Sequence, residues 1–277
     1  MGIILLHCGS ICQPARVLRE IQKFETSTNP VRVMTNTGEG FIKSVNNSHG
    51  ASALVSELVA AELGTWIGLK VPPFAIIENC EIAITMSDGQ IMQPPFFFSK
   101  LIDGESRDFG GDFVNKLREP YDATKLVVFD TWIRNLDRYV ESRAHSNDEN
   151  ILYSRSETPR KYELVPIDHT HCISGHDFMN EGPINWDNII NDEKIYGRFP
   201  EFLPLITRET IDTAIGKLGE LERNFVLEVI NSIPIEWGFS RTAGEALADF
   251  ICQRADFLVQ NLPFNLLTQA DLPFMGN

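Results

Sequence analysis

The stretch from Phe129 to Ile173 limits what this chain can fold into more than any other. It contains two strand-like runs, Ile151–Ser154 and Tyr162–Ile167, on either side of a segment with the turn-forming residues Ser, Thr and Pro. This pattern predicts a β-hairpin. Because a hairpin brings the outer ends of its two strands together, we expect Asn150 and Asp168 to lie roughly 5 Å apart.

An Asn and an Asp at that separation form a candidate cation site. Their oxygen atoms can share a hard cation such as Mg²⁺, which proteins hold through few ligands while water and phosphate complete its shell. Asn147 competes with Asn150 for this role, and we favour Asn150 because it adjoins the apolar run. Asn and Asp are also common turn residues at strand ends. The nearby Asp137, together with a Lys and a Glu in the first third of the chain, favours a phosphate site.

That Lys and that Glu are Lys43 and Glu57. Lys43 lies in the strand-like run FIKSV, where a lysine is disfavoured unless its ammonium has a partner. The alternative is an edge-strand lysine that prevents aggregation. Glu57 lies on the following helical stretch beside Leu54 and Leu58, so its carboxylate can turn inward towards a sheet. Kinase folds use such an ion pair to hold a lysine against the phosphates of a nucleotide.

The first hundred residues have a strand-rich pattern. Strand-like runs flank one helical stretch, Ser52–Leu69, so we expect a small, mostly antiparallel sheet with one helix. The start of the first run, residues 15–21, is equally compatible with a helix. The expected strands are 15–24, 31–35, 41–45, 74–78, 81–86 and 96–100.

From about residue 112 onward the pattern is helical. The stretch 123–135 is apolar on nearly all sides, which predicts a buried helix that leads directly to Asp137. Two amphipathic stretches, Thr207–Asn231 and Ser240–Leu262, predict helices that support this second part of the chain.

Composition and charge exclude several classes of protein. The chain has 277 residues, 43% hydrophobic and 22% charged, which is typical of a folded protein with a substantial core. Its net charge of −14 argues against binding to nucleic acid or anionic lipid, since both require clustered Lys and Arg. The apolar opening, MGIILLHCGSIC, is too short to span a bilayer. Because the five cysteines are also scattered, we expect a reduced, cytoplasmic protein, with a secreted effector as the alternative.

A set of short segments in a fixed order carries a resemblance to a known family. The segments are FIKS with SELVAAELGTWIGLKVP, FDTWIRNLDRY, ENILY, LVPIDHTHCI, and IPIEWGF with FICQRADFL. With these in order over most of residues 30–260, the chain resembles HipA-like kinases and, more distantly, type II phosphatidylinositol kinases. The resemblance implies a two-lobed α+β protein-kinase-like fold. A polar break at 101–104 would separate an N-lobe, residues 1–100, from a C-lobe, residues 101–277.

The resemblance also implies a function, that of an ATP-dependent phosphotransferase of the serine/threonine protein kinase type that uses Mg²⁺. Lys43 would bind the phosphates of the nucleotide, and Glu57 would orient Lys43. Asp137 would be the catalytic base, while Asn150 and Asp168 would hold the metal ion. Phosphoryl transfer requires mainly positioning and charge neutralisation from the protein, so these residues are sufficient parts.

The nucleotide base is expected at the lobe boundary, where Ser99, Lys100 and Leu101 end an aromatic strand. A protein is the expected substrate, and a small antitoxin-like regulatory partner would fit the resemblance. A lipid or small-molecule kinase, a nucleotide-binding pseudokinase or interaction module, and a nucleotidyl transferase are the alternatives.

The chain departs from the family pattern in two places. An apparent insertion, VESRAHSNDE, separates Asp137 from Asn150, and the expected phosphate loop, residues 25–29, has no glycine. The hydroxyls and backbone amides of that loop can still hold phosphate.

Three further polar residues allow more than one interpretation. Arg138 can bind a phosphate or hold its own loop in place. His169 and His171 can form a metal pair on one side of a strand, although packing behind Asp168 is the favoured interpretation because no Cys or third His is close in sequence.

Overall fold

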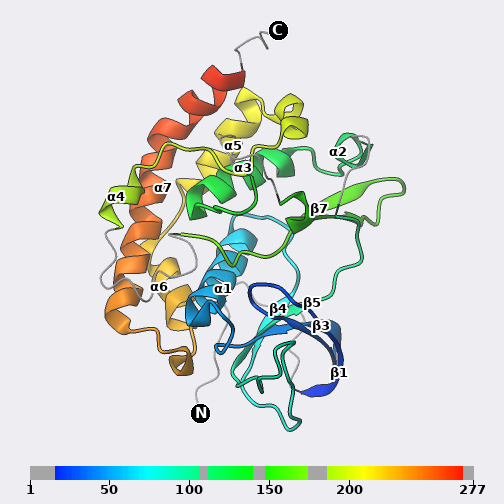
Figure 1. The fold of residues 1–277 in the computed structure, drawn as a ribbon. Coiled ribbons are helices and arrows are strands. Elements are labelled where there is room, and N and C mark those ends of the chain that lie inside the picture. The colour runs from blue at the N-terminus through cyan, green and yellow to red at the C-terminus, as the bar shows by residue number, and fades with distance from the viewer. Residues whose placement is uncertain (1–15, 107–111, 140–146, 174–185, 271–277) are drawn as a thin grey trace.

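The computed structural model describes residues 16–106, 112–139, 147–173 and 186–270. Its first part contains a five-stranded sheet in the order β1-β2-β3-β5-β4, and all neighbouring strands in it are antiparallel. In Figure 1 this sheet lies at the lower end of the molecule. The strands are β1 (Val17–Lys23), β2 (Val31–Thr35), β3 (Gly38–Lys43), β4 (Phe74–Ile77) and β5 (Phe96–Lys100).

Side-chain alternation explains these strands. In β2, Val31, Val33 and Thr35 are buried and the two residues between them are partly exposed, which is the period of two of a half-buried strand. Strand β5, which lies between β3 and β4, begins with three buried phenylalanines without alternation because both of its faces are covered there. Phe97 packs into the main core below the sheet, and Phe98 packs into a second apolar cluster on the other face.

Helix α1, Gly50–Trp66, connects the sheet to the rest of the molecule. It contacts β5 on one side and α6, Arg223–Asn231, on the other. Every α1 residue from Ser52 to Gly64 is therefore buried, including Glu57. A carboxylate in such a place requires a partner within the protein.

The second part of the chain is mainly helical. The longest helix, α7, contacts α3, α4, α5 and α6, and in Figure 1 it runs along one side of the molecule in orange and red. A β-hairpin of β6 and β7 projects on the other side. The elements not yet given are α2 (Asp112–Asn115), α3 (Tyr121–Ile133), β6 (Ile151–Arg155), β7 (Tyr162–Pro166), α4 (Asp187–Ile190), α5 (Arg208–Leu218), α7 (Arg241–Ala270), and the 3-10 turns Asp148–Asn150, Pro200–Leu205 and Ile235–Trp237.

The expected α+β organisation is confirmed, with an antiparallel sheet first and helices after it. The hairpin is confirmed, as is the buried helix before Asp137. The first run is a strand, β1, and the helical alternative over 15–21 is wrong for its described residues. The cysteines at positions 8 and 12 lie outside the described residues.

The strand expected over 81–86 is wrong. Thr85 pairs only with Ile91 in an isolated bridge, because Asp88 and Gly89 turn the chain back on itself. This small loop buries Ile84 and Met86 against the outer face of the sheet. The apolar pattern of these residues therefore reflects their burial, although they do not form a strand of the sheet.

The single helix expected over 207–231 is two helices, α5 and α6. Thr207 caps the start of α5 through its hydroxyl, and Gly219 follows its last residue. The chain turns before α6 begins at Arg223, so that both helices can pack on α7.

A hydrogen bond also joins the helical part to the segment just before β5. The indole nitrogen of Trp237 donates to the carbonyl oxygen of Pro95, just before β5, at 2.9 Å. Trp237 is buried, so this contact lies in the interior between the two parts.

Candidate active site

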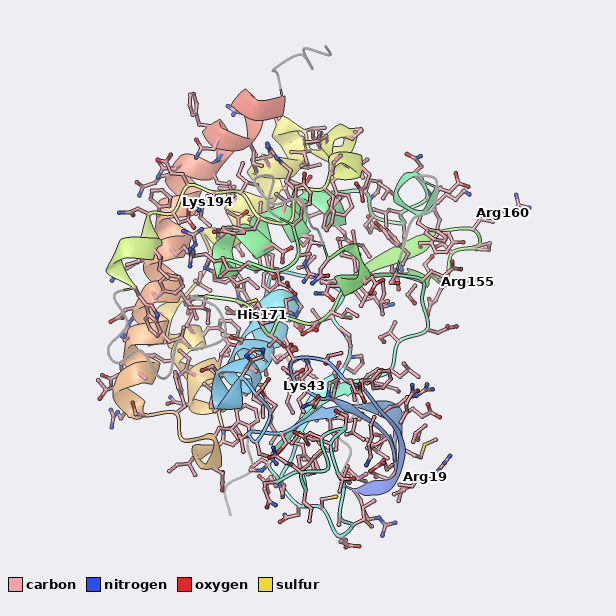
Figure 2. All side chains as sticks on the ribbon, in the orientation of Figure 1. Arg19, Lys43, Arg155, Arg160, His171 and Lys194 are labelled. Carbon is pink, nitrogen blue, oxygen red and sulfur yellow. The ribbon has the colours of Figure 1, made fainter. Side chains whose placement is uncertain are left out.

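The ammonium group of Lys43 is the centre of a buried polar cluster. Lys43 is the last residue of β3, and its Nζ contacts Oε1 of Glu57 on α1. The same Nζ lies 3.0 Å from Oδ1 of Asp168 and 3.1 Å from Oγ1 of Thr170. Figure 2 shows Lys43 at the side of the sheet that faces the helical part. The structure thus brings together the Lys, the Glu and the second Asp that the sequence singles out.

Charge pairing decides the ionisation of this cluster. Burial lowers the pKa of Lys43, but the carboxylates of Asp168 and Glu57 outweigh burial and raise that pKa above its usual value. Burial raises the pKa of Glu57, and Lys43 opposes the rise. Partial burial also acts against the charge of Asp168, but Lys43 and the Thr170 hydroxyl hold the pKa of Asp168 well below its usual range. Asp168 is therefore a carboxylate throughout the neutral range, and its side chain is 45% exposed.

Asp137 lies in the turn that follows α3. Arg134 ends that helix in the left-handed conformation, with φ of 51°, and reverses the chain. Oδ2 of Asp137 accepts a hydrogen bond from Nδ2 of Asn147 at 2.8 Å and a longer one from Nδ2 of Asn150 at 3.4 Å. Both candidate Asn residues therefore face the Asp137 carboxylate, Asn147 from an exposed position and Asn150 from a half-buried one.

A backbone hydrogen bond closes the base of the hairpin. The backbone N of Ile167 donates to the carbonyl oxygen of Asn150 at 3.0 Å, so Asn150 is bonded to the residue that precedes Asp168. Asp168 has φ of 53°, a left-handed conformation that is uncommon for residues other than Gly, although Asn and Asp adopt it more often than most. A residue held in this conformation next to a cleft is a candidate for a functional role.

The residues at the hairpin base fit a magnesium ion. Mg²⁺ needs only one or two carboxylates because it retains water and binds phosphate. Asp168 supplies an ionised, half-exposed carboxylate, and Asn150, which has a side-chain amide oxygen, is bonded through its backbone to Ile167, the residue before Asp168. In the described parts of the chain, no group of three or more His, Cys, Asp and Glu residues could hold a metal ion.

The two histidines after Asp168 do not form a metal pair. Nε2 of His169 lies 3.0 Å from Nη2 of Arg138, and burial lowers the pKa of His169 well below its usual value. The ring of His171 instead packs edge-on against His49, with 5.3 Å between the ring centroids. His169 thus packs behind Asp168, which is the favoured sequence interpretation.

Arg138 holds the loop in place. Its side chain is fully buried, and its Nε lies 2.7 Å from Oδ2 of Asp130 on α3. The guanidinium also donates to the carbonyl oxygens of Asn150, just before β6, and Ile167, just after β7. Burial raises the pKa of Asp130 to about 6, although the charge of Arg138 acts against that rise. Arg138 thereby ties the Asp137 turn to the base of the β6–β7 hairpin, and its guanidinium is occupied by these contacts.

Gly197 packs directly against this ion pair, and its replacement should be costly. A Cβ on Gly197 would lie 2.3 Å from Oδ2 of Asp130, and its φ of +71° already disfavours other residues. We expect Gly197→Ala to lower the free energy of unfolding by about 2 to 4 kcal/mol. Gly89→Ala is the matched control, because Gly89 also has a positive φ but nothing lies within 4 Å of its Cβ position. Urea unfolding of both variants measures the difference, and equal losses would contradict the close packing.

A cleft of about 310 Å³ lies between the sheet and the hairpin. Lys43, Glu57 and Asp168 line it, as do the predicted base-binding residues Ser99, Lys100 and Leu101. The backbone amides of Lys100 and Leu101 already donate to the carbonyls of Pro73 and Glu39. The sequence interpretation missed seven lining residues, Pro30, Phe41, Pro72, Phe97, Ile102, Leu152 and Ile167.

Strand alternation is the signal that could have found some of these residues. Phe41 points to the face opposite Ile42, which is in the outer apolar cluster. Pro30, which directly follows the expected phosphate loop (residues 25–29), lines the cleft, whereas none of residues 25–29 is among its lining residues.

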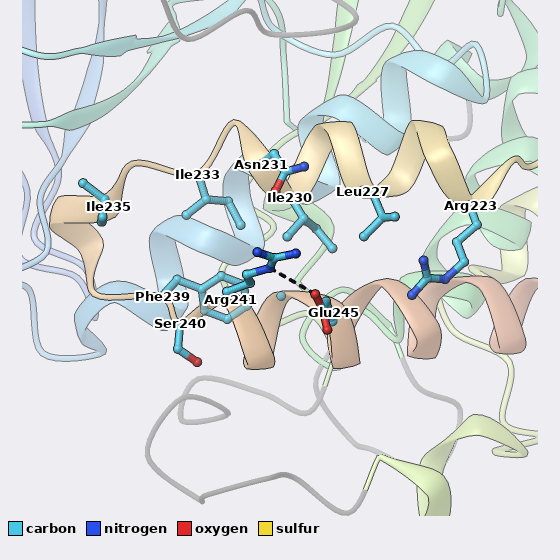
Figure 3. Close-up of a pocket in the computed structure, with 11 residues that line it drawn as sticks. Arg223, Leu227, Ile230, Asn231, Ile233, Ile235, Phe239, Ser240, Arg241 and Glu245 are labelled. Atoms are coloured by element: carbon cyan, nitrogen blue, oxygen red, sulfur yellow. Dashed lines mark hydrogen bonds and ion pairs between the residues drawn. The ribbon is translucent and has the colours of Figure 1, made fainter. Parts of the chain in front are cut away.

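A larger hollow of about 790 Å³ lies elsewhere, between α6 and α7. Figure 3 shows its side chains, in which apolar and polar or charged groups are mixed, with an ion pair between Arg241 and Glu245 across part of it. Arg223, at one end, is bound to Asp249. This hollow contains none of the residues of the Lys43 cluster and offers no comparable set of groups for phosphoryl transfer.

A model of the HipA-like kinase family matches residues 17–262 of the chain. The chain belongs to this family. The resemblance seen in the sequence is thereby confirmed, and this HipA-like kinase has the α+β fold expected of it.

A solved structure agrees with the family. The fold of this HipA-like kinase resembles the crystal structure of CtkA, a proinflammatory kinase of Helicobacter pylori, with a TM-score of 0.57. The alignment covers 93% of this chain and 98% of the other at 15% sequence identity, a level at which the fold alone is shared. A search of curated proteins finds no match. Among the helices that the structure describes, none has the length and apolar character needed to cross a membrane.

Proposed function

We propose that this HipA-like kinase transfers the γ-phosphoryl group of ATP to a Ser or Thr hydroxyl of a protein, with Mg²⁺ as its metal ion. The observation that supports this most strongly is that Nζ of Lys43 contacts Glu57 and, at 3.0 Å, Asp168. A strand, a helix and a hairpin from distant parts of the chain therefore supply the charges that one triphosphate requires.

Each charged residue then has one task. Lys43 would bind phosphate oxygens, and Glu57 would hold Lys43 in position from inside α1. Asp168 and Asn150 would hold Mg²⁺, which when bound neutralises charge on the phosphates. Asp137 would accept the proton of the substrate hydroxyl, and its bonds to the two Asn amides keep its carboxylate directed at the hairpin base.

The apolar lining of the cleft suits the nucleotide base. Phe41 comes from the sheet side, and Leu152 and Ile167 come from the hairpin. With the base among these three side chains, Lys100 and Leu101 would mark the boundary between an N-lobe of residues 1–100 and a C-lobe of residues 101–277. We place the enzyme in the cytoplasm, acting on a protein substrate and open to control by a small regulatory partner.

A labelling experiment tests the proposal. The protein is incubated with γ-labelled ATP and a cell lysate, with Mg²⁺ or with EDTA, and modified residues are identified by mass spectrometry. We expect labelled Ser or Thr residues when Mg²⁺ is present and no labelling when EDTA removes it. Labelling should return when Mg²⁺ is added back. Phosphoinositide vesicles and small-molecule alcohols serve as separate acceptors.

The contrary outcomes are distinct. Label found in a lipid or a small molecule would show that the reaction is phosphoryl transfer but that the acceptor is not a protein. Transfer of a nucleotide instead of a phosphate would add a larger mass to the acceptor. A protein that neither labels any acceptor nor gains thermal stability from ATP with Mg²⁺ would contradict the proposed function.

A further inference from the structure

Thr170 has a hydroxyl group at the centre of the Lys43 cluster. It lies two residues after Asp168 and is 1% exposed. Its Oγ1 is 2.7 Å from Oδ1 of Asp168, 3.0 Å from Oε1 of Glu57 and 3.1 Å from Nζ of Lys43. No other hydroxyl among the described residues is bonded to both of these carboxylates.

A count of protons limits what this hydroxyl can do. A Thr hydroxyl has one proton to donate and lone pairs to accept with, whereas a Lys ammonium can only donate. Thr170 must therefore accept from Lys43. Its single proton can go to Asp168 or to Glu57 but not to both at once, although both carboxylates lie within hydrogen-bond distance.

The two carboxylates differ in how freely they can move. Glu57 is fixed within α1 and is 5% exposed. The side chain of Asp168 is 45% exposed and borders the cleft. Only Asp168 is placed to turn towards a ligand in the cleft, and when it turns away the proton of Thr170 still has Glu57 as an acceptor.

We propose that Thr170 is a positioning residue that links metal binding at Asp168 to the orientation of Lys43. Without a metal ion, its hydroxyl donates to Asp168 and holds that carboxylate beside Lys43. When Asp168 turns to a metal ion, the hydroxyl donates to Glu57 and keeps Glu57 and Lys43 in place for phosphate. This inference rests on the proposed function, because it takes Asp168 as a metal ligand.

Two substitutions separate a hydrogen-bonding role from a packing role. Thr170→Val keeps the shape and removes the hydroxyl, whereas Thr170→Ser keeps the hydroxyl and removes a methyl group. If the hydroxyl acts as proposed, the Val variant is impaired and the Ser variant remains close to wild type. Packing alone predicts the opposite order, because only the Ser variant would leave a void.

The first measurement is binding, which does not depend on turnover. Mg²⁺ is titrated by calorimetry into protein saturated with a non-hydrolysable ATP analogue. We expect Thr170→Val to weaken Mg²⁺ binding about tenfold, and Thr170→Ser to change it less than about threefold. Tenfold is the lower end of the effect of residues that orient metal ligands. Thr213→Val, at an exposed site on α5, is the control and should not change it.

The second measurement is the Mg²⁺ dependence of phosphate transfer. We expect Thr170→Val to raise the Mg²⁺ concentration for half-maximal rate, and the KM for ATP, by about tenfold. A Val variant with wild-type Mg²⁺ binding, or a Ser variant impaired as much as the Val variant, would overturn the role of Thr170. Wild-type protein that transfers no phosphate would overturn the proposed function instead, and the calorimetric titration would still decide whether Thr170 supports the metal site.

Discussion

Asp168→Asn should abolish phosphate transfer and the Mg²⁺-dependent part of ATP binding while the protein stays folded. Asp168 is the ionised carboxylate of the proposed metal site, and Asn has nearly the same shape without the charge. A metal ion contributes several kcal/mol of transition-state charge stabilisation. Since about 1.4 kcal/mol is a factor of ten in rate, we expect a loss of at least about a thousandfold. Rates of labelling from ATP, and thermal shifts with an ATP analogue with and without Mg²⁺, measure both effects.

The fold should survive this change because Lys43 keeps its contact with Glu57, and Thr170 can still donate to the Asn side-chain oxygen. Circular dichroism checks this. Asp212→Asn is the matched control, because Asp212 is an exposed acid on α5 far along the chain from the cleft residues. An Asp168→Asn variant that labels its substrate at the rate of the control would show that Asp168 is not a metal ligand for the reaction.

Asp137→Asn should slow phosphate transfer while leaving ATP binding intact. Asp137 does not line the cleft in which Lys43 and Asp168 lie, and its bonds go to the amides of Asn147 and Asn150. As the general base it would contribute a factor of about 10² to 10⁴ in rate. We therefore expect kcat to fall by this factor, with little change in the KM for ATP. The thermal shift with an ATP analogue and Mg²⁺ should stay at the wild-type value.

This pattern distinguishes the two residues, because Asp168→Asn should remove the Mg²⁺-dependent thermal shift and Asp137→Asn should keep it. Asp256→Asn, an exposed position on α7, serves as the control and should transfer phosphate normally. A wild-type kcat in the Asp137→Asn protein would remove Asp137 from the reaction. A loss of ATP binding would instead show that the turn after α3 depends on this carboxylate for its shape.

The elements that could be predicted from sequence are those fixed by neighbouring residues. Strands β2 and β5 have the predicted bounds, and the hairpin and helix α3 are close to them. Side-chain alternation, turn-forming residues and a continuous apolar run act over a few positions, so the pattern is visible in the chain itself. The same reasoning failed at 81–86, where residues bury apolar side chains without pairing with the sheet.

In the candidate site, the sequence identified the charged residues but left several of their partners undetermined. Lys43, Glu57 and Asp168 were expected to meet, and they do. Whether Arg138 binds phosphate or holds its loop could not be decided, because the answer depends on Asp130 and on the carbonyls of the hairpin. Thr170 cannot be recognised from the sequence, because a single Thr after an Asp has no pattern of its own.

The sequence by itself determined the kinds of local structure and the order of the polar groups along the chain, because both depend on contacts between near neighbours. Only the tertiary structure decided which groups share one small volume. Lys43 and Asp168 are 125 residues apart in sequence and 3.0 Å apart in space. That closeness depends on how the sheet, α1 and the hairpin pack together, and the burial from that packing turns ordinary side chains into a cluster with shifted pKa values.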